Sequence, residues 1–152
     1  MIPFRVTFRA GASLFEQVVY ASIRAMVSGQ LRPGDAYPSV RVLSRELKIN
    51  PNTAHKIVAY LVGQGFLETR PGIGTVVATI PDSSRKERAE LLGQEIEELV
   101  VEAKRLGIET EEVIGALRAH WERLSQNPMS QTQGHGAPGA GEVGTKEGGR
   151  KR

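Results

Sequence analysis

The chain has 152 residues, no cysteine and a formal net charge of +3. The lack of cysteine excludes disulfide scaffolds and thiolate metal sites, and no apolar run approaches the roughly 18 residues that would cross a bilayer. Because Met1 leads into Phe4, Arg5 and Val6 rather than into a basic segment followed by an apolar one, we expect no signal peptide. These features predict a soluble protein of the cytoplasm without a membrane partner.

The net charge hides an asymmetry along the chain. Residues 1–80 hold nine Lys/Arg against four Asp/Glu, residues 81–126 hold seven against eleven, and residues 127–152 hold four against two. A basic module beside an acidic one indicates a polyanionic partner for the first, because phosphates attract cationic side chains. The alternative is a solvated surface with scattered charges.

Two elements are predicted before residue 30. In the stretch PFRVTF, the apolar residues Phe4, Val6 and Phe8 alternate with polar ones, which is typical of a short half-buried strand. An S-x-x-E capping box at Ser13 then opens a predicted helix over about residues 14 to 28, with apolar residues at helical spacing.

Two more helices are predicted around a short turn. Ser39 is a suitable N-cap for a short second helix, which runs to the turn Lys48-Ile49-Asn50. Asn50 can cap the third helix with its side-chain oxygen, and Pro51 suits the first helical position, where a missing N–H costs nothing. The start of the third helix is therefore fixed.

The third helix has one apolar and one polar face. Its apolar residues recur at i, i+3, i+4 and i+7 and predict a buried stripe of Ala54, Ile57, Val58 and Leu61. The polar residues left on the first two turns are Asn52, Thr53, His55 and Lys56. None is needed for a core, so the pattern predicts a helix-turn-helix whose second helix can enter a major groove.

A β-hairpin follows. The stretches FLETR and TVVATI read as strands joined by Pro71-Gly72-Ile73-Gly74. A helix-turn-helix followed by a hairpin is a winged helix, and the wing would bring Arg70 and the backbone amides of Gly72 and Thr75 near phosphates or a minor groove. We expect the first strand, PFRVTF, to be available for pairing with this hairpin.

The acidic part predicts two amphipathic helices. The first covers about residues 84 to 106, and its seam steps by four and three residues through Leu92, Ile96, Leu99, Ala103 and Leu106. The second, with Thr110 as a candidate cap, has apolar positions at Ile114, Leu117, Trp121 and Leu124. Two such helices cannot bury both stripes alone. Packing on the first domain is one solution, and we favour pairing with a second copy.

The remaining stretch, residues 127–152, contains seven glycines, ends in GGRKR and has no apolar period. We expect a disordered tail there.

Catalysis is not predicted. The three histidines, His55, His120 and His135, lack metal-ligand spacing. The glycines of PGIGT have no following Gly-Lys-Ser/Thr and suit a tight hairpin turn. Adjacent carboxylates such as Glu97 and Glu98 point about 100° apart on a helix. We therefore predict no enzyme, no catalytic residue, no metal and no cofactor.

The amino-terminal motifs in register resemble a known family. The run LFEQVVYASIRAMVSGQLRPGDAYPSVRVLSRELKINPNTAHKIVAYLVGQGFLETRPGIGTVV is similar to the DNA-binding domain of GntR-family bacterial transcription regulators, with their G-x-L-x-P-G-D, P-S-x-R-x-L, N-x-x-T and G-x-G-T-x-V patterns. The resemblance covers about residues 1–80. The stretch EAKRLGIETEEVIGAL resembles the compact carboxy-terminal part of the YtrA-type subfamily, which dimerises through its helices.

The patterns and the resemblance together predict an α+β architecture in three parts: a winged helix-turn-helix domain (1–80), a helical dimerisation region (81–126) and a disordered tail (127–152). The resemblance implies a homodimeric, nucleoid-associated repressor that binds an inverted-repeat operator of transport or cell-envelope stress genes. The family's DNA contacts fall here on Arg41, Asn50, Asn52, Thr53, His55, Arg70, Gly72 and Thr75. Lys56 would add phosphate attraction. The helix seams would form the dimer through Leu92, Ile96, Leu99, Ala103, Leu106, Ile114, Leu117 and Trp121.

Other roles stay open for several of these residues. Helix capping explains Asn50 without DNA, and an ion pair with Glu46 would explain Arg41. Tyr37 stands where the family usually has leucine, which suggests a packing swap. For the domain as a whole, the alternatives are a protein-interaction module and a module that binds nucleic acid without sequence preference. The sequence indicates no pocket for a small-molecule effector.

Overall fold

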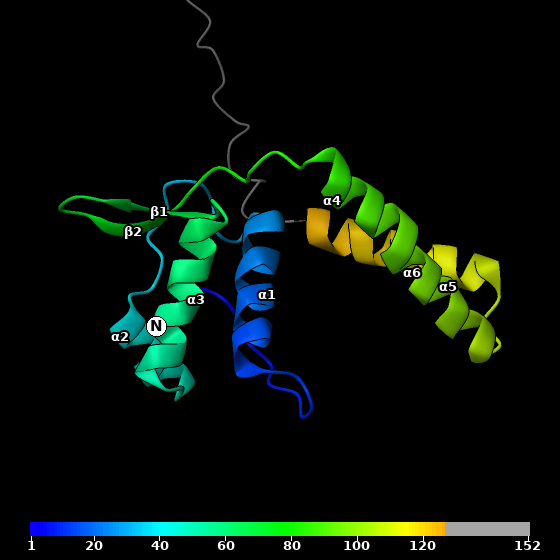
Figure 1. Cartoon of the computed structure of the whole chain (residues 1–152), viewed down its shortest axis with the longest axis horizontal. Coiled ribbons are helices and arrows are strands. Elements are labelled where there is room, and N and C mark those ends of the chain that lie inside the picture. The colour runs from blue at the N-terminus through cyan, green and yellow to red at the C-terminus, as the bar shows by residue number, and fades with distance from the viewer. Residues whose placement is uncertain (127–152) are drawn as a thin grey trace, which may run out of the picture.

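The computed structural model describes residues 1–126, and the predicted disordered tail lies outside this range. Figure 1 shows α1, α2, α3 and a β-hairpin at one end of the molecule and the helices of the carboxy-terminal part at the other. The elements in chain order are α1 (Leu14–Val27), α2 (Val40–Leu47), α3 (Pro51–Gly63), β1 (Leu67–Arg70), β2 (Gly74–Val77), α4 (Arg85–Glu90), the π-helical turn η1 (Leu91–Glu95), α5 (Ile96–Arg105) and α6 (Thr110–Ser125).

The first three helices begin where the capping residues predict. The Ser13 Oγ accepts a hydrogen bond from the Glu16 N–H (3.1 Å), and the Ser39 Oγ accepts one from the Val42 N–H (3.2 Å). Each bond satisfies an amide that the first turn leaves without a partner. α3 ends at Gly63, and two residues later Gly65 has a φ of +83° while the N–H of Phe66 donates to the carbonyl of Leu61. Gly65 therefore supplies the left-handed residue of a Schellman motif.

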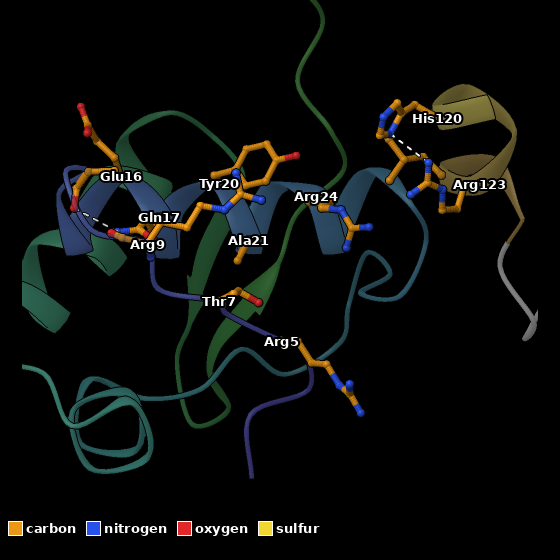
Figure 2. Close-up of a pocket in the computed structure, with 12 residues that line it drawn as sticks. Arg5, Thr7, Arg9, Glu16, Gln17, Tyr20, Ala21, Arg24, His120 and Arg123 are labelled. Carbon is orange, nitrogen blue, oxygen red and sulfur yellow. Dashed lines mark hydrogen bonds between the residues drawn. The ribbon is translucent and has the colours of Figure 1, made fainter. Parts of the chain in front are cut away.

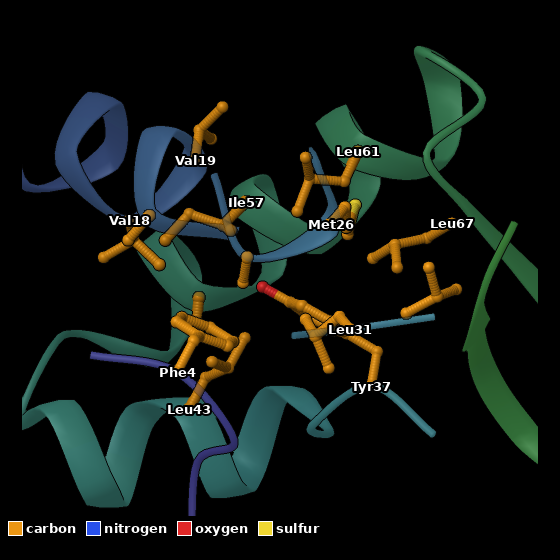
Figure 3. Packing of buried hydrophobic residues seen from close by; sticks show 14 of the residues in the cluster. Phe4, Val18, Val19, Met26, Leu31, Tyr37, Leu43, Ile57, Leu61 and Leu67 are labelled. Carbon is orange, nitrogen blue, oxygen red and sulfur yellow. The ribbon is translucent and has the colours of Figure 1, made fainter. Parts of the chain in front are cut away.

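One apolar core joins these helices to the hairpin (Figure 3). The predicted stripe of α3 supplies Ala54, Ile57 and Leu61, all fully buried, while Val58 is partly buried. α1 contributes Val18 from the facing side. Because α3 is held along its whole buried stripe, its opposite face has a fixed orientation.

The predicted strand at PFRVTF is wrong, since residues 1–13 form no strand. Phe4 is buried and stacks on Tyr37 with ring centroids 5.9 Å apart, whereas Phe8 is exposed. The backbone at Arg9 is tied to α1, because its N–H donates to the Gln17 side-chain oxygen (2.6 Å). The segment therefore packs as an irregular strap with one aromatic anchor.

The place beside the hairpin is occupied by the loop before α2. β1 and β2 pair antiparallel with Leu67 opposite Val77. On the edge of β2 that faces away from β1, the Val77 N–H donates to the Asp35 carbonyl (2.8 Å), and the Tyr37 N–H donates to the Thr75 carbonyl (2.9 Å). This loop, not the amino-terminal segment, extends the small sheet.

The carboxy-terminal part contains the predicted helical run from residue 85, with one interruption. Ser84 and Glu87 form a capping box that lowers the pKa of the Glu87 carboxyl, because the carboxylate accepts the Ser84 N–H (2.7 Å). The turn η1 then interrupts the predicted regular seam with wider π-type hydrogen bonding. α5 ends at Arg105 and is followed by Gly107, whose φ is +71°.

α6 begins one residue earlier than expected. Thr110 is the first helical residue rather than the cap, and Glu109 occupies the cap position without a side-chain hydrogen bond to the helix. Within residues 1–126, no helix is long and apolar enough to span a membrane.

Candidate nucleic-acid interface

The turn before α3 sets the position of its amino-terminal end. Lys48 adopts a left-handed conformation, with φ of +53°, and reverses the chain after α2. Ile49 is buried, and its carbonyl accepts a hydrogen bond from the Ser44 Oγ (2.8 Å). The Asn50 Oδ1 then accepts the Asn52 N–H (2.8 Å), and Pro51 takes the first helical position. Asn50 therefore caps α3, as the sequence predicts.

The polar face of α3 is as the pattern predicts. The side chains of Asn52, His55 and Lys56 are exposed, and that of Thr53 is partly buried. Among the described residues, these four side chains make no hydrogen bond or ion pair. The first two turns of α3 thus present an amide, an imidazole and an ammonium group to solvent, and all three can donate hydrogen bonds.

Arg41 lies in the first turn of α2, the helix that packs against α3. It is exposed and has no ion-pair partner in the described part of the chain. The expected alternative, a bridge from Arg41 to Glu46, is absent, because Glu46 instead lies 3.6 Å from the Arg45 guanidinium. The Arg41 side chain is free to bind an external acceptor.

The tip of the wing is a tight turn. The Ile73 N–H donates to the Arg70 carbonyl (3.1 Å), with Pro71 in the second position and Gly72 at φ +76° in the third. This combination fits a type II turn, which requires a positive φ at its third residue. Gly72 is exposed and Thr75 is partly buried, so the wing presents backbone as well as side chains.

Arg70 is not free at the edge of the wing. Its Nε and Nη2 donate to the Oε1 of Glu68 at 2.8 and 2.5 Å. Both side chains are about half exposed, and an exposed pair of this kind contributes about 0–1 kcal/mol. The pair therefore orients Arg70 without preventing exchange of its partner.

The residues predicted for dimerisation lie around a groove of about 410 Å³ between α5 and α6. Five of them line it: Ile96, Leu99, Ala103, Ile114 and Leu117. The other three, Leu92, Leu106 and Trp121, lie outside the lining and are more than half exposed. Only Ala103 of the whole set is buried. The two helices of one chain therefore leave most of this apolar surface in contact with water.

Comparison with known proteins agrees with this geometry. Residues 15–77 match the family described as bacterial regulatory proteins, gntR family. An uncharacterized HTH-type transcriptional regulator of Bacillus subtilis, YhcF, is 29% identical over 76% of this chain and 95% of its own. The HTH-type transcriptional repressor YtrA of the same organism is 28% identical over 69% of this chain and 82% of its own.

Solved structures show the same arrangement. A transcriptional antiterminator from Listeria monocytogenes superposes with a TM-score of 0.70 at 26% identity, covering 82% of this chain and 93% of that one. A GntR family transcriptional regulator from the same species gives 0.54 at 28% identity, covering 74% and 98%.

The fold and the exposed face of α3 define a winged helix-turn-helix protein. More particularly, residues 15–77 are a GntR-family domain, and the similarity to YtrA over most of the chain supports the YtrA-type assignment. Proteins of this family are DNA-binding regulators of transcription, and these relatives are regulators rather than enzymes.

Proposed function

We propose that this chain binds duplex DNA in a sequence-specific manner and that α3 is its recognition helix. The observation that carries the proposal is a set of polar side chains on the first turns of a helix fixed by its cap and its core, which have no partner among residues 1–126. An amide at Asn52 has the geometry for a bidentate contact with adenine, and Lys56 has the charge for a phosphate.

The residues beside α3 complete this surface. Arg41 is available for a bidentate contact with guanine or for a phosphate clamp, since a guanidinium serves both. Thr53 and His55 would contact the backbone or a base edge from the same turns of α3. Asn50 combines its cap with proximity to the duplex, because the amino-terminal end of a helix attracts phosphate.

The wing would contribute through Arg70, Gly72 and Thr75. Glu68 holds two of the Arg70 nitrogens, and Nη1 remains for a phosphate oxygen. The exposed backbone at Gly72 allows close approach to the sugar-phosphate chain, since no side chain intervenes. These contacts position the domain without reading sequence.

A homodimer would form through the carboxy-terminal helices, from about residue 81 to 126. The apolar groove between α5 and α6 and the exposed Leu92, Leu106 and Trp121 supply a surface that a second copy can cover. Covering it with an identical surface gives a two-fold axis. Two recognition helices related by such an axis suit an inverted repeat with half-sites about one helical turn apart.

We propose that the protein represses transcription, and a relative named as a repressor supports this proposal. A dimer seated on an operator blocks polymerase without any further chemistry. The resemblance to YtrA-type regulators points to transport or cell-envelope stress genes as targets.

Selection of bound duplexes from a random pool tests the DNA proposal. The selected duplex is then titrated by fluorescence anisotropy at several salt concentrations. We expect an inverted repeat bound with Kd of about 10⁻⁸ M or tighter. Binding without any enriched sequence, fading as salt rises, would instead indicate a reader of phosphates only. No binding at all would favour a protein-interaction module.

A further inference from the structure

A cationic pocket lies between the amino-terminal strap, α1 and the end of α6 (Figure 2). Its volume is about 620 Å³, within the range of small-molecule sites. Four arginines and one carboxylate line it, together with His120: Arg5, Arg9, Arg24, Arg123 and Glu16. In the described part of the chain, none of these arginines forms a salt bridge.

Three of the arginines come from three different segments. Arg5 belongs to the strap, Arg24 to the last turns of α1, and Arg123 to the end of α6. Figure 2 shows their guanidinium groups on one side of the pocket, with Tyr20 toward the other. Like charges around one cavity repel unless an anion lies between them, and a guanidinium fork matches phosphate or carboxylate oxygens.

Tyr20 adds a second chemical feature. Its side chain is 67% exposed although it lines the pocket. An exposed aromatic face next to a cationic cluster suits a ligand that has both a planar ring and anionic groups, because the ring can stack while the anions bind arginine.

We propose that this pocket binds a small molecule of the nucleotide class. Its phosphates contact Arg5, Arg24 and Arg123, and its planar ring stacks on Tyr20.

The position of the pocket distinguishes this ligand from operator DNA. One face of α1 packs against α3 through the core, and the pocket opens on a different face, which includes Tyr20 and Arg24. In Figure 1, α1 lies between α3 and the helices α4 to α6. A duplex seated on α3 is therefore on the other side of α1.

Binding at this site has a regulatory consequence that rests on the proposed function. The pocket walls belong to the DNA-binding domain and to α6, so a bound polyanion links the two parts through Arg24 and Arg123. In a dimer joined by the carboxy-terminal helices, that link sets the relative orientation of the two copies of α3. Operator affinity would then depend on nucleotide concentration.

Isothermal titration calorimetry on the full chain without DNA tests the pocket directly. The probes are ATP, inorganic triphosphate and adenosine. We expect ATP and triphosphate to bind, ATP more tightly, and adenosine not to bind. Arg24→Gln and Arg123→Gln should each weaken ATP binding about tenfold or more, since each removes a charge-assisted hydrogen bond. Tyr20→Ala should weaken ATP but not triphosphate.

The matched control is Arg118→Gln, which removes the same charge from α6 outside the pocket lining. Equal weakening by Arg118→Gln would reduce the effect to overall charge and overturn the proposal. Failure of ATP and triphosphate to bind, or binding of adenosine as tight as that of ATP, would also overturn it. Thermal melting of each variant confirms that it is folded.

A separate anisotropy titration of the selected duplex, without nucleotide, distinguishes the two proposals. We expect Arg24→Gln to leave duplex affinity unchanged and Asn52→Ala to lower it. If Arg24→Gln weakens the duplex as much as Asn52→Ala does, the arginines contact DNA and the nucleotide site is wrong. Calorimetry of ATP does not depend on operator binding, so either proposal can fail while the other stands.

Discussion

The Ser22 Oγ and the Tyr37 hydroxyl lie 2.7 Å apart inside the core, where they share a hydrogen bond. Ser22 also donates to the Val18 carbonyl (2.8 Å), so the shared proton belongs to Tyr37. This bond joins α1 to the loop that extends the sheet. It also gives the buried Tyr37 hydroxyl a hydrogen-bond partner inside the core.

Removing the two partners should have unequal effects. Ser22→Ala strands the buried Tyr37 hydroxyl and should lower the free energy of unfolding by about 1–3 kcal/mol, whereas Tyr37→Phe leaves Ser22 bonded to Val18 and should cost about 1 kcal/mol. Urea denaturation of both single variants and of the double variant measures this as a cycle. Additive losses would show that the bond contributes nothing of its own.

Tyr37 should also make stability fall at high pH. Burial raises the pKa of Tyr37 from 10.0 to about 12. The folded state thus binds the proton more tightly than the unfolded state, so this stabilisation is complete below pH 10 and is lost as pH rises from about 10 to 12. The loss is at most about 2–3 kcal/mol. Tyr37→Phe is the reference, because phenylalanine has no hydroxyl to titrate. Between pH 10 and 12 the wild-type protein should lose more stability than Tyr37→Phe, and below pH 10 the difference between the two proteins should stay constant.

Asn50 variants can separate capping from DNA contact. Asn50→Ala should destabilise the domain by about 1 kcal/mol through loss of the cap. Asn50→Asp and Asn50→Ser both keep a capping oxygen, but only the aspartate puts a negative charge near phosphates. We expect duplex affinity to fall for aspartate and to survive for serine. Equal affinity of the two in anisotropy titrations would place Asn50 away from the DNA.

We predict that Asn52 contacts a base of the operator. Asn52→Ala should weaken specific binding by about 1–3 kcal/mol and relax selectivity at one base pair, without changing the melting temperature. Arg41→Ala is expected to behave similarly. Gln94→Ala serves as a control, because it removes an amide from η1, outside the proposed interface. Operator affinity at the wild-type level in the Asn52 variant would remove that residue from the interface.

The dimer proposal can be tested in the helix seam. Leu99→Asp places a charge in the groove between α5 and α6, where a second copy would bury it, and should give monomers in sedimentation velocity. Val101→Asp makes the same change on the same helix, outside the groove lining, and should leave the dimer intact. A Leu99→Asp protein that still sediments as a dimer would show that the two copies meet elsewhere.

Local signals predicted α3 well. The cap at Asn50, the proline after it and the apolar period from Ala54 to Leu61 all lie within one short segment, and all are confirmed. The hairpin is confirmed for the same reason, because Pro71 and Gly72 define its turn locally. The roles of the polar residues in DNA binding stay predictions.

The sequence pattern did not predict the contacts between distant segments. The alternation at Phe4, Val6 and Phe8 is that of a strand, but the edge of β2 is occupied by residues near Asp35, and Phe4 packs on Tyr37 instead. No periodicity in one segment reveals that competition. The arginine pocket escaped notice similarly, because its side chains come from three segments that meet only in the folded chain.

The loop before α2 covers one edge of the hairpin, which leaves β1 as the outer strand of the small sheet. An outer strand is where another chain can add by backbone pairing and start aggregation. Here β1 is only four residues long, and it carries the charged pair Glu68 and Arg70, whose side chains are about half exposed. The same ion pair that orients the Arg70 side chain therefore also protects the protein from self-association through its wing.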